Sequence, residues 1–358
     1  MSEELGVLIV GAGEMGARHA GHWREAGARV MGVFDPDTLR ADALASLHGG
    51  TAVRTLDEAL SLDAVGVVSV CTPTFLHANF TIASLRAGKH VLCEKPAALT
   101  LAEALAMKEA EEASGKLLRI GFMRRFDPAT HQLRRFAAGI GSPLLAQATI
   151  AAGVRPKLMM HDAAANGGPI IDMCCHVFDL WALLFGEAPA LVRAHGYTFS
   201  EHKPQVAAIR RKALDSAHLT LAYPGGSVGQ IQVSWGLPSG IAPIERHTYM
   251  APEGLVTVEW PSEVTLHDGH GTTRWSTRGE DPWRAQIAAF AAEIAGLELA
   301  PGGSGTQAAV DPRPVLATID DGIAALRVSL AAIRSVEGRC DVGPAELEPE
   351  PQMPLTGA

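Results

Sequence analysis

The sequence predicts an α/β fold in two parts: a parallel, doubly wound sheet, then an α+β part with a large, mostly antiparallel open sheet. Three observations predict it. The first 120 or so of the 358 residues alternate short apolar runs with helical patterns, which is the rhythm of parallel βαβ units. A glycine-rich turn follows the first apolar run directly. After residue 123 the rhythm changes to strand-like runs separated by Pro and Gly turns.

The elements of the first part follow one another in strict alternation. The expected strands are Val7–Val10, Arg29–Phe34, Val65–Cys71, His90–Cys93 and Leu117–Phe122. The expected helices between them are Gly16–Ala26, Pro36–Leu47, Asn79–Ala87 and Leu101–Ser114. We expect this part to be one domain, residues 1–122.

The second part, residues 123–340, begins with a helix at Pro128–Ala137 and a strand at Leu144–Ala151, and one long apolar helix spans residues 168–185. Strand-like runs follow at 190–199, 216–223, 227–235, 245–251 and 254–260, and "YPGGSVGQIQVSW" is typical of a hairpin. Helices are expected at 281–297, with Asp281 as cap and Pro282 in the first turn, and at Val315–Ser335. The Pro- and Glu-rich end, residues 341–358, predicts a mobile tail.

Composition narrows the class of protein. Hydrophobic residues make up 47% and charged residues 19%, as in a globular enzyme. The net charge of −9 does not favour nucleic acid or an anionic membrane as a partner. We expect no segment to be long and apolar enough to span a bilayer. The odd count of 5 cysteines, without a CxxC pair, favours reduced thiols in the cytoplasm.

The glycine-rich turn has the spacing of a dinucleotide phosphate loop. It lies between a strand and a helix, the context that GxGxxG requires, and predicts a Rossmann domain. The first glycine permits the tight turn, the second lets the backbone approach a pyrophosphate, and the third packs helix against strand. The residues expected at the cofactor are Gly11, Gly13, Glu14, Met15 and Gly16.

Asp35 ends the second strand, where such domains place an acid that binds the adenosine ribose diol. Its charge, with that of Asp37, would repel the 2′-phosphate of NADP. We therefore expect NAD, with NADP the less favoured alternative, for which Arg40 is the nearest argument.

Two further strands end in groups suited to chemistry, at the sheet edge where ligands bind in open α/β folds. Glu94-Lys95-Pro96 follows one strand, and its lysine can lie beside a nicotinamide and its substrate; a surface ion pair is the plainer alternative. Cys71-Thr72-Pro73 ends the other strand. The residues expected to border the dinucleotide here are Thr72, Pro73, His77, Glu94 and Lys95.

Three titratable residues interrupt the apolar helix at 168–185. At about 100° per residue, Asp172, His176 and Asp179 fall on one face, which must meet water or a site. Histidine suits removal of an alcohol proton at neutral pH, and Asp172 one turn earlier could orient it. Asp179 could bind substrate or cap a loop. We expect no metal, because Cys174 and Cys175 point about 100° apart and cannot share a tetrahedral ion with His176 without partners elsewhere.

Four motifs in order resemble the Gfo/Idh/MocA oxidoreductases: GxGxMGxxH at the start, CTPxxxH from Cys71, CEKP from Cys93, and the GG…D…H…D helix. "GFMRRFDP" at 121–128 is similar to the inositol 2-dehydrogenase branch. The resemblance covers nearly the whole chain. It implies oxidation of a sugar or polyol hydroxyl with NAD(P), with Lys95, Asp172 and His176 as catalytic and substrate-binding residues, and homodimers or homotetramers formed through the second sheet. From the motif, Arg124 is preferred for substrate and Arg125 for a structural pair.

The sequence also departs from that branch. "TIAAGVRPKLMMHD" is smaller and more apolar than the polar segment usual there, and Trp235 stands where a polar or tyrosine-rich edge is expected. A sugar or cyclitol other than myo-inositol is therefore open. Two other functions also stay open: an NAD-dependent glycosidase that oxidises its substrate transiently, and a non-catalytic sensor of NAD and sugar.

Overall fold

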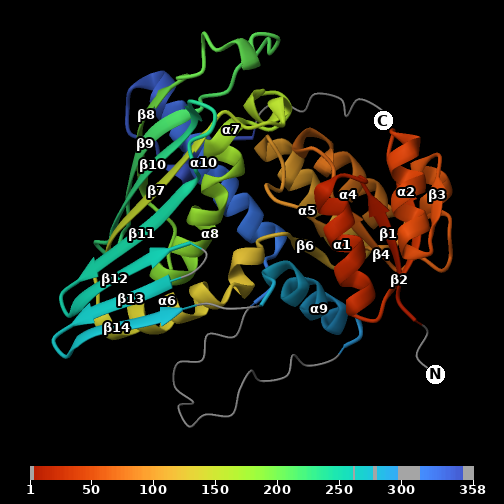
Figure 1. The fold of residues 1–358 in the computed structure, drawn as a ribbon, viewed down its shortest axis with the longest axis horizontal. Coiled ribbons are helices and arrows are strands. Elements are labelled where there is room, and N and C mark those ends of the chain that lie inside the picture. The colour runs from red at the N-terminus through yellow and green to blue at the C-terminus, as the bar shows by residue number, and fades with distance from the viewer. Residues whose placement is uncertain (1–3, 261–262, 277–279, 297–314, 350–358) are drawn as a thin grey trace.

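Two sheets organise the computed structural model, which describes residues 4–260, 263–276, 280–296 and 315–349 (Figure 1). A six-stranded parallel sheet belongs to the N-terminal part, and an eight-stranded, mostly antiparallel sheet belongs to the C-terminal part. The predicted fold class is confirmed.

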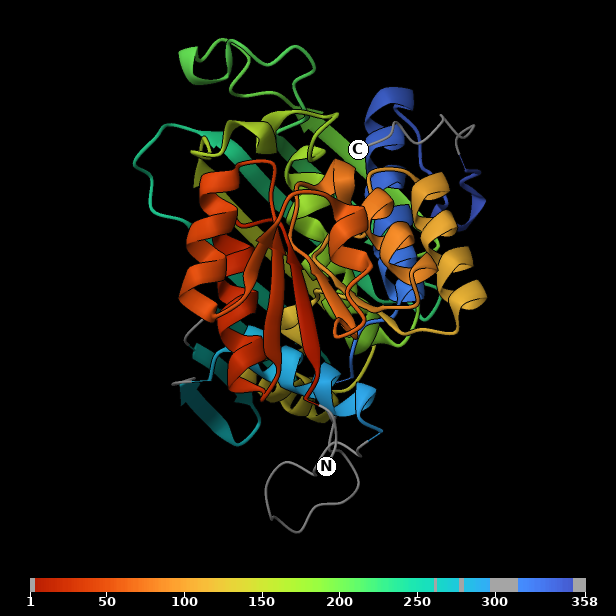
Figure 2. The same ribbon diagram turned by 90° about the vertical axis from the view of Figure 1, so that its right-hand side faces the viewer.

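The parallel sheet has the strand order β3-β2-β1-β4-β5-β6 of a doubly wound fold. Its strands are β1 (Gly6–Val10), β2 (Arg29–Phe34), β3 (Thr51–Val53), β4 (Val67–Val70), β5 (His90–Cys93) and β6 (Leu118–Ile120). Helices α1 (Glu14–Glu25), α2 (Thr38–His48), α3 (Leu56–Leu60), α4 (His77–Arg86) and α5 (Leu101–Ser114) lie beside it (Figure 2). The sequence did not indicate β3 or α3, because segments of 3 and 5 residues are too short to show a period.

This strand order places the first functional loops together. β1 and β4 are neighbours although β2 and β3 separate them in the chain, so the order reverses between them. The loops after β1 and β4 therefore form the crevice where open α/β sheets bind ligands. β5, which ends at Glu94-Lys95, pairs with β4 on the other side.

The second sheet has the order β14-β13-β12-β11-β7-β10-β9-β8. Its strands are β7 (Leu145–Gly153), β8 (Leu191–Tyr197), β9 (Ser216–Ala222), β10 (Val228–Leu237), β11 (Ile244–Ala251), β12 (Gly254–Glu259), β13 (Glu263–Asp268) and β14 (Gly271–Ser276). The predicted hairpin joins β9 to β10. Among the described strands of this sheet only β7 and β10 pair in parallel, so both end at the same side of the sheet.

Helices separate the two sheets. In Figure 1, α6 (Pro128–Ile140), α8 (Cys174–Phe185) and α10 (Ile319–Gly338) cover the face of the large sheet that looks toward the Rossmann part. The predicted helix from Asp281 is α9 (Pro282–Ile294), and it packs on α1 through Trp23 and Phe290, whose ring centroids lie 6.2 Å apart. The domain boundaries at 122 and 340 remain a prediction, and α9 lies with the first part.

The long helix predicted at 168–185 is divided. α7 (Gly168–Asp172) and α8 meet at Met173, because the carbonyl of Asp172 does not accept the usual bond from His176. That carbonyl instead accepts from Lys95 Nζ at 2.9 Å and from Cys175 Sγ, while the His176 amide donates to Met173. A lysine from the other domain thus ends the first helix.

The expectation that no segment is long and apolar enough for a membrane needs correction. Gly168–Phe185 meets that criterion, with a mean hydropathy of 1.4 over 18 residues. Of this stretch, 72% is buried inside the protein, as in a core helix, and length and composition alone are weak evidence for a span.

Part of the segment expected to be a mobile tail is packed. Val342 pairs with Val192 of β8, and Leu347 is buried. Arg327 of α10 donates to the carbonyls of Pro344 and Leu347. Residues 350–358 lie outside the described part of the chain.

Candidate active site

The glycine-rich loop has the backbone that a bound pyrophosphate requires. Gly11 has a φ of +99°, and a Cβ there would lie 2.7 Å from the Cys71 carbonyl oxygen. A Cβ on Gly16 would lie 1.8 Å from the Gly11 oxygen, whereas around Gly13 nothing lies within 4 Å. Glu14 and Met15 begin α1, whose N-terminus points its free amides at the loop. These residues fit a dinucleotide.

Asp35 lies directly against this loop. Its carboxylate accepts from the Ala12 amide at 2.7 Å and from the Asp37 amide at 2.8 Å. Arg40, the residue that argued for NADP, is paired with Asp37 at 3.1 Å. The acid and the phosphate loop are therefore held together where the adenosine ribose of a dinucleotide would lie.

Lys95 and Asp172 form an ion pair across the two parts of the chain. Lys95 Nζ lies 2.5 Å from Asp172 Oδ1, and both side chains are largely buried. Burial alone would lower the pKa of Lys95, but Asp172, with smaller contributions from Cys175 and Glu94, raises it above its ordinary value. Lys95 is therefore a fixed ammonium at neutral pH, suited to stabilising an alkoxide rather than to removing a proton.

Glu94, the residue before Lys95, is fixed by a hydrogen bond from a buried side chain of α1. It accepts from His19 Nε2 at 2.9 Å, and His19 Nδ1 is 2.8 Å from Ser69 Oγ. Burial would raise the pKa of Glu94, but the hydrogen bond and charge of His19, and the charge of Lys95, lower it. Glu94 thus ties the lysine loop to α1 and β4, and the surface pair of Glu94 with Lys95 considered from the sequence is not what forms.

His77 joins the loops after β4 and β5. Its Nδ1 lies 2.8 Å from the Pro96 oxygen and its Nε2 lies 2.9 Å from the Thr72 oxygen. Both acceptors are carbonyls, so both nitrogens donate and the ring is an imidazolium. Burial opposes this charge, but Cys93 and the two carbonyls raise the pKa of His77 to about 9. With no nitrogen left over, His77 positions Thr72 and Pro73.

This clamp predicts a pH-dependent stability. The folded pKa of His77, about 9, lies above the unfolded value of 6.5, so its contribution is complete below pH 6.5 and is lost as the pH rises through 9. That contribution is about 3 kcal/mol. Urea unfolding should show the wild-type free energy falling more steeply than that of His77→Gln between these pH values. Parallel curves for the two proteins would contradict the imidazolium.

His176 lies near Lys95 without bonding to Asp172. It is 5% exposed, its ring meets Phe122 edge-on at 6.0 Å, and its Nδ1 is buried without a partner in the described part of the chain. Burial first, and then the positive charges of Lys95 and Arg124, hold its pKa well below 6.5. His176 is therefore neutral at pH 7 and able to accept a proton. The expectation that Asp172 orients it is wrong for this structure, because the carboxylate is paired with Lys95 instead.

The two arginines of η2 (Met123–Phe126) diverge. Arg124 forms a two-bond ion pair with Glu245 of β11, its Nη2 lying 2.7 Å from Oε2, and its guanidinium lies 4.9 Å from the centre of the Trp260 ring. Burial would raise the pKa of Glu245, but Arg124 and His247 lower it far below its ordinary range. The charge of Arg124 reaches His176, where that of Glu245 opposes it in part. Substrate binding by Arg124 stays a prediction.

Arg125 makes the structural pair. Its Nε and Nη2 bind Asp179 at 2.5–3.1 Å, and Nη2 also lies 2.9 Å from Asp321 of α10. Both carboxylate oxygens of Asp179 are bound by Arg125, so Asp179 does not cap a loop. The three polar residues of the apolar helix therefore have different roles. Asp172 and His176 face Lys95, whereas Asp179 holds α8 to η2 and α10.

Two family models match the chain. Residues 5–122 match the oxidoreductase family with NAD-binding Rossmann fold, and residues 135–247 match the GFO/IDH/MocA C-terminal domain. Inositol 2-dehydrogenase of Rhizobium meliloti (strain 1021) is 30% identical over 92% of this chain and 96% of its own. The chain belongs to the Gfo/Idh/MocA oxidoreductase family. It is accordingly an NAD-binding oxidoreductase, as the sequence resemblance indicated.

Other proteins are similar to this chain over nearly the full length. Inositol 2-dehydrogenase 2 of Saccharopolyspora erythraea is 28% identical, covering 98% of both chains. The crystal structure of GenD2 from gentamicin A biosynthesis, in complex with NAD, superposes with a TM-score of 0.77 at 25% identity, covering 96% of this chain and 97% of that one.

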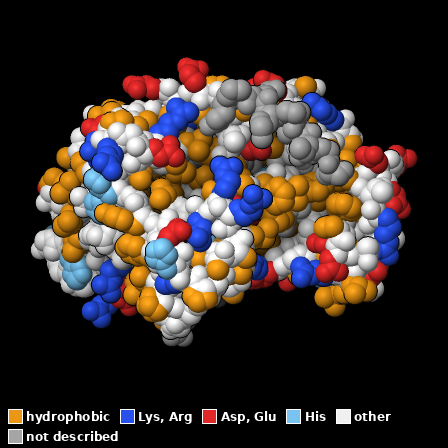
Figure 3. All heavy atoms as spheres, turned by 90° about the horizontal axis from the view of Figure 1, so that it is seen from above, with side chains coloured by type: hydrophobic (Ala, Val, Ile, Leu, Met, Phe, Trp, Pro, Cys, Tyr) orange, Lys and Arg blue, Asp and Glu red, His pale blue; other side chains and the backbone are white. Residues whose placement is uncertain are grey.

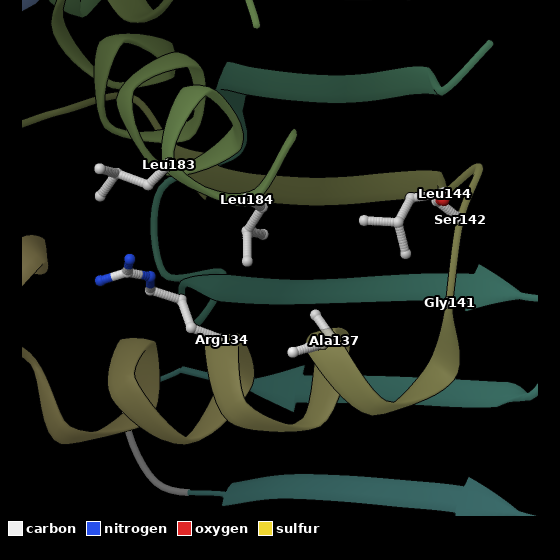
Figure 4. Close-up of a pocket in the computed structure, with 8 residues that line it drawn as sticks. Arg134, Ala137, Gly141, Ser142, Leu144, Leu183 and Leu184 are labelled. Atoms are coloured by element: carbon white, nitrogen blue, oxygen red, sulfur yellow. The ribbon is translucent and has the colours of Figure 1, made fainter. Parts of the chain in front are cut away.

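A hollow of about 380 Å³ lies away from these groups (Figure 4). Its walls come from α6, α8 and the turn before β7, and they consist of Arg134, Ala137, Ala138, Gly141, Ser142, Leu144, Leu183 and Leu184. None of these side chains is a general base suited to an alcohol. For this Gfo/Idh/MocA protein we therefore place the chemistry where the loop ends meet, not in this hollow.

Sequence reasoning missed several residues of the site. Glu245 lies in a stretch with no recognisable spacing, and only the fold brings it to Arg124. Arg155 and His161 lie in the segment "TIAAGVRPKLMMHD", which differs from the polar segment usual in the family, and the fold joins them to each other. His19 had a visible sign, since it ends the GxGxMGxxH motif. Within residues 4–260, 263–276, 280–296 and 315–349, no three metal-ligating side chains converge.

Proposed function

We propose that this protein is an NAD-dependent dehydrogenase that oxidises a secondary hydroxyl of a cyclitol or sugar. The observation that carries the proposal is the Lys95–Asp172 ion pair beside a buried, neutral His176, at the edge where the phosphate-loop crevice opens. A positive group and a base in one place are what an alcohol needs in order to lose its proton while its carbon loses a hydride.

In this proposal His176 takes the hydroxyl proton. The ammonium of Lys95 stabilises the oxygen as negative charge develops on it, and Asp172 keeps that ammonium in place. Substrate oxygens are bound by Lys95, Asp172 and His176, and Arg124 adds positive charge near His176. Because Asp172 and Lys95 are already paired, a substrate hydroxyl would join an organised pair rather than assemble it.

NAD is the cofactor we propose, held by the residues of the phosphate loop, Asp35, and the loops at Thr72–Pro73 and Glu94–Lys95. A bound nicotinamide would accept the hydride from the alcohol carbon. The preference for NAD over NADP rests on Asp35, whose carboxylate is fixed by the Ala12 and Asp37 amides, and on Arg40 being paired with Asp37.

Asp35→Ala tests that preference. Removing the carboxylate deletes its hydrogen bonds to the ribose diol and its repulsion of a 2′-phosphate, so the ratio of kcat/KM for NAD to that for NADP should fall at least about tenfold. Because the ratio compares two cofactors on one variant, any general loss of folded protein cancels. An unchanged ratio would mean that Asp35 does not contact the ribose.

The open face of the large sheet is the proposed subunit interface. Helices cover the other face, and several apolar side chains of its strands remain exposed, including Leu145, Leu191, Ile244 and Met250. We propose a homodimer or homotetramer through this face, which light scattering after size-exclusion chromatography would test. The free cysteines suit the reducing cytoplasm.

An absorbance screen for NADH formation tests the activity. Purified protein would be incubated with NAD⁺, and then NADP⁺, across inositols, aldoses, sugar acids and deoxy-sugars. NADH formation with a ring polyol or sugar supports the dehydrogenase. Glycoside cleavage with retained cofactor and no net NADH would favour the NAD-dependent glycosidase. Binding of NAD without any turnover would favour a sensor, although sensors usually lose the lysine or the histidine that this chain keeps.

A further inference from the structure

The segment between β7 and α7, residues 154–166, crosses from the large sheet to the cofactor loops; we name it the bridging segment. Lys157 Nζ lies 2.9 Å from Glu14 at the start of α1. The Phe75 amide donates to the Ala165 oxygen, and Asn166 Nδ2 donates to Thr74 Oγ1, both at 3.3 Å. The bridging segment therefore lies across the loops after β1 and β4.

Three side chains come together at the sheet end of this segment. The Arg155 guanidinium lies 5.5 Å from the centre of the Trp235 ring, and the His161 ring meets the same indole edge-on at 6.4 Å. The Arg155 amide donates to His161 Nε2 at 2.9 Å. Because β7 and β10 end side by side, and α7 packs on both β10 and the turn that contains His161, this cluster lies at the end of the sheet where Asp172 lies.

The cluster offers donors that have no acceptor. His161 Nε2 accepts a hydrogen bond, so its ring proton is on Nδ1, and this buried atom has no partner among the residues that the structure describes. Arg155 Nε is likewise buried without a partner, and within the described residues its guanidinium forms no ion pair. His161 itself is only 2% exposed. Buried donors left unpaired cost free energy unless a ligand satisfies them.

The nearby carboxylates are already engaged. Asp215 is buried and accepts from Ser216 and from the backbone and hydroxyl of Ser200. Glu14 is bound by Lys157. A further cation, Lys203, donates to the Gly236 oxygen next to Trp235. Figure 3, which views the molecule from above, shows Lys and Arg side chains near the middle of this face, with Asp and Glu side chains among them. Within the described residues no carboxylate forms an ion pair with Arg155 or Lys203, although the charge of Asp215 acts on His161.

We propose that Arg155, packed on Trp235 and supported by His161, binds an anionic group of the substrate, so that the preferred substrate is an acidic sugar or cyclitol carrying a carboxylate. A guanidinium binds a carboxylate through two parallel hydrogen bonds, and stacking on an indole fixes its plane. This inference rests on the proposed function, because it assigns the far end of the substrate whose hydroxyl faces Lys95 and His176.

The pyrophosphate of the cofactor is the other source of an anion. Lys157 first, and then Arg18 and Arg155, lower the pKa of Glu14, so the charge of Arg155 reaches the phosphate loop. Two contacts favour the substrate: Trp235 and His161 both hold Arg155 to the sheet side of the segment, and Lys157 already occupies the loop side.

Isothermal titration calorimetry on the full-length protein with NAD⁺ bound tests the assignment. The ligands are D-glucuronate, D-galacturonate and D-gluconate, each compared with its neutral partner D-glucose, D-galactose or D-glucitol. The variants are Arg155→Gln and Arg155→Lys. Lys212→Gln is the matched control. It also removes a positive charge, but the charge it removes is already paired with Glu201. Initial rates of NADH formation are measured on the same samples, and NAD⁺ affinity is titrated separately.

At least one acid should bind more tightly than its neutral partner. Arg155→Gln should abolish that advantage with a loss of about 10- to 100-fold in acid affinity, Arg155→Lys should lose less, and Lys212→Gln should stay within about threefold of wild type. The inference is overturned if no acid is preferred, if the preference survives Arg155→Gln, or if only NAD⁺ affinity falls. Acid binding without NADH formation would contradict the proposed activity and leave this inference standing. Turnover of neutral polyols without a preference for acids would support the proposed activity and contradict this inference.

Discussion

His176→Ala should lose at least about 10² in kcat while binding NAD with unchanged affinity, because general-base catalysis typically contributes about 10²–10⁴ in rate. The imidazole lies beside Lys95 and Phe122 and makes no hydrogen bond to the phosphate loop. Its loss should therefore affect the chemical step and not cofactor binding. Steady-state rates with the best substrate of the NADH screen, together with NAD titration, would measure both quantities.

The pH profile provides a second readout for the same residue. Burial and the charges of Lys95 and Arg124 hold the pKa of His176 well below 6.5, so it is deprotonated across neutral pH. The wild-type kcat/KM should stay flat from about pH 6.5 upward, and its acidic decline should begin below the ordinary histidine pKa. His270→Ala, at the exposed turn between β13 and β14, is the control and should keep the wild-type profile. A His176→Ala enzyme with near-normal kcat would remove the base assignment.

The sequence predicted the first domain well because its patterns are local. The parallel strands other than the short β3 are apolar runs, and the close contacts that a Cβ would make at Gly11 and Gly16 show why the phosphate loop has glycine there. The antiparallel class of the second sheet was predicted, but its strands β13 and β14 were not. β14 is almost wholly exposed and has no alternating apolar side chains that could indicate a strand.

The site was predictable in its members and not in its pairings. Lys95, Asp172 and His176 were found from motifs, yet the spacing on one helix suggested that Asp172 serves His176. The structure pairs Asp172 with Lys95, some 77 residues away in the chain, and divides the helix to do so. Helical periodicity describes which residues share a face, but it contains no information on which partner from another domain will reach that face. For the same reason Glu245 and Arg155 could not be assigned.

From the sequence, only the motif distinguished the roles of the two adjacent arginines of η2. The burial of Arg125 now makes its structural role measurable. The side chains of Arg125 and Asp179 are each 4% exposed, and Arg125 also binds Asp321. Burial raises the pKa of Asp179 even though Arg125 opposes this shift. Without Arg125, therefore, two carboxylates would face each other with one of them inside the core.

Arg125→Met should consequently lower the free energy of unfolding by about 3–5 kcal/mol, as measured by urea denaturation at pH 7. The matched control is Arg193→Met, which removes an exposed pair with Asp341 and should cost less than about 1 kcal/mol. Arg125→Met with Asp179→Leu should recover much of the loss, because no buried charge is left unpaired.

The pH dependence of this variant separates an unpaired charge from a packing defect. Without Arg125 the folded pKa of Asp179 lies still further above its unfolded value, so the folded state binds a proton that the unfolded state has released, and stability falls as the pH rises. Arg125→Met should accordingly be closer to wild type at pH 5 than at pH 7. An equal deficit at both values would assign the loss to packing. The second arginine of "MRRF" would then be a space-filling residue, and the ion pair that joins α8 to η2 and α10 would contribute little to holding His176 in place.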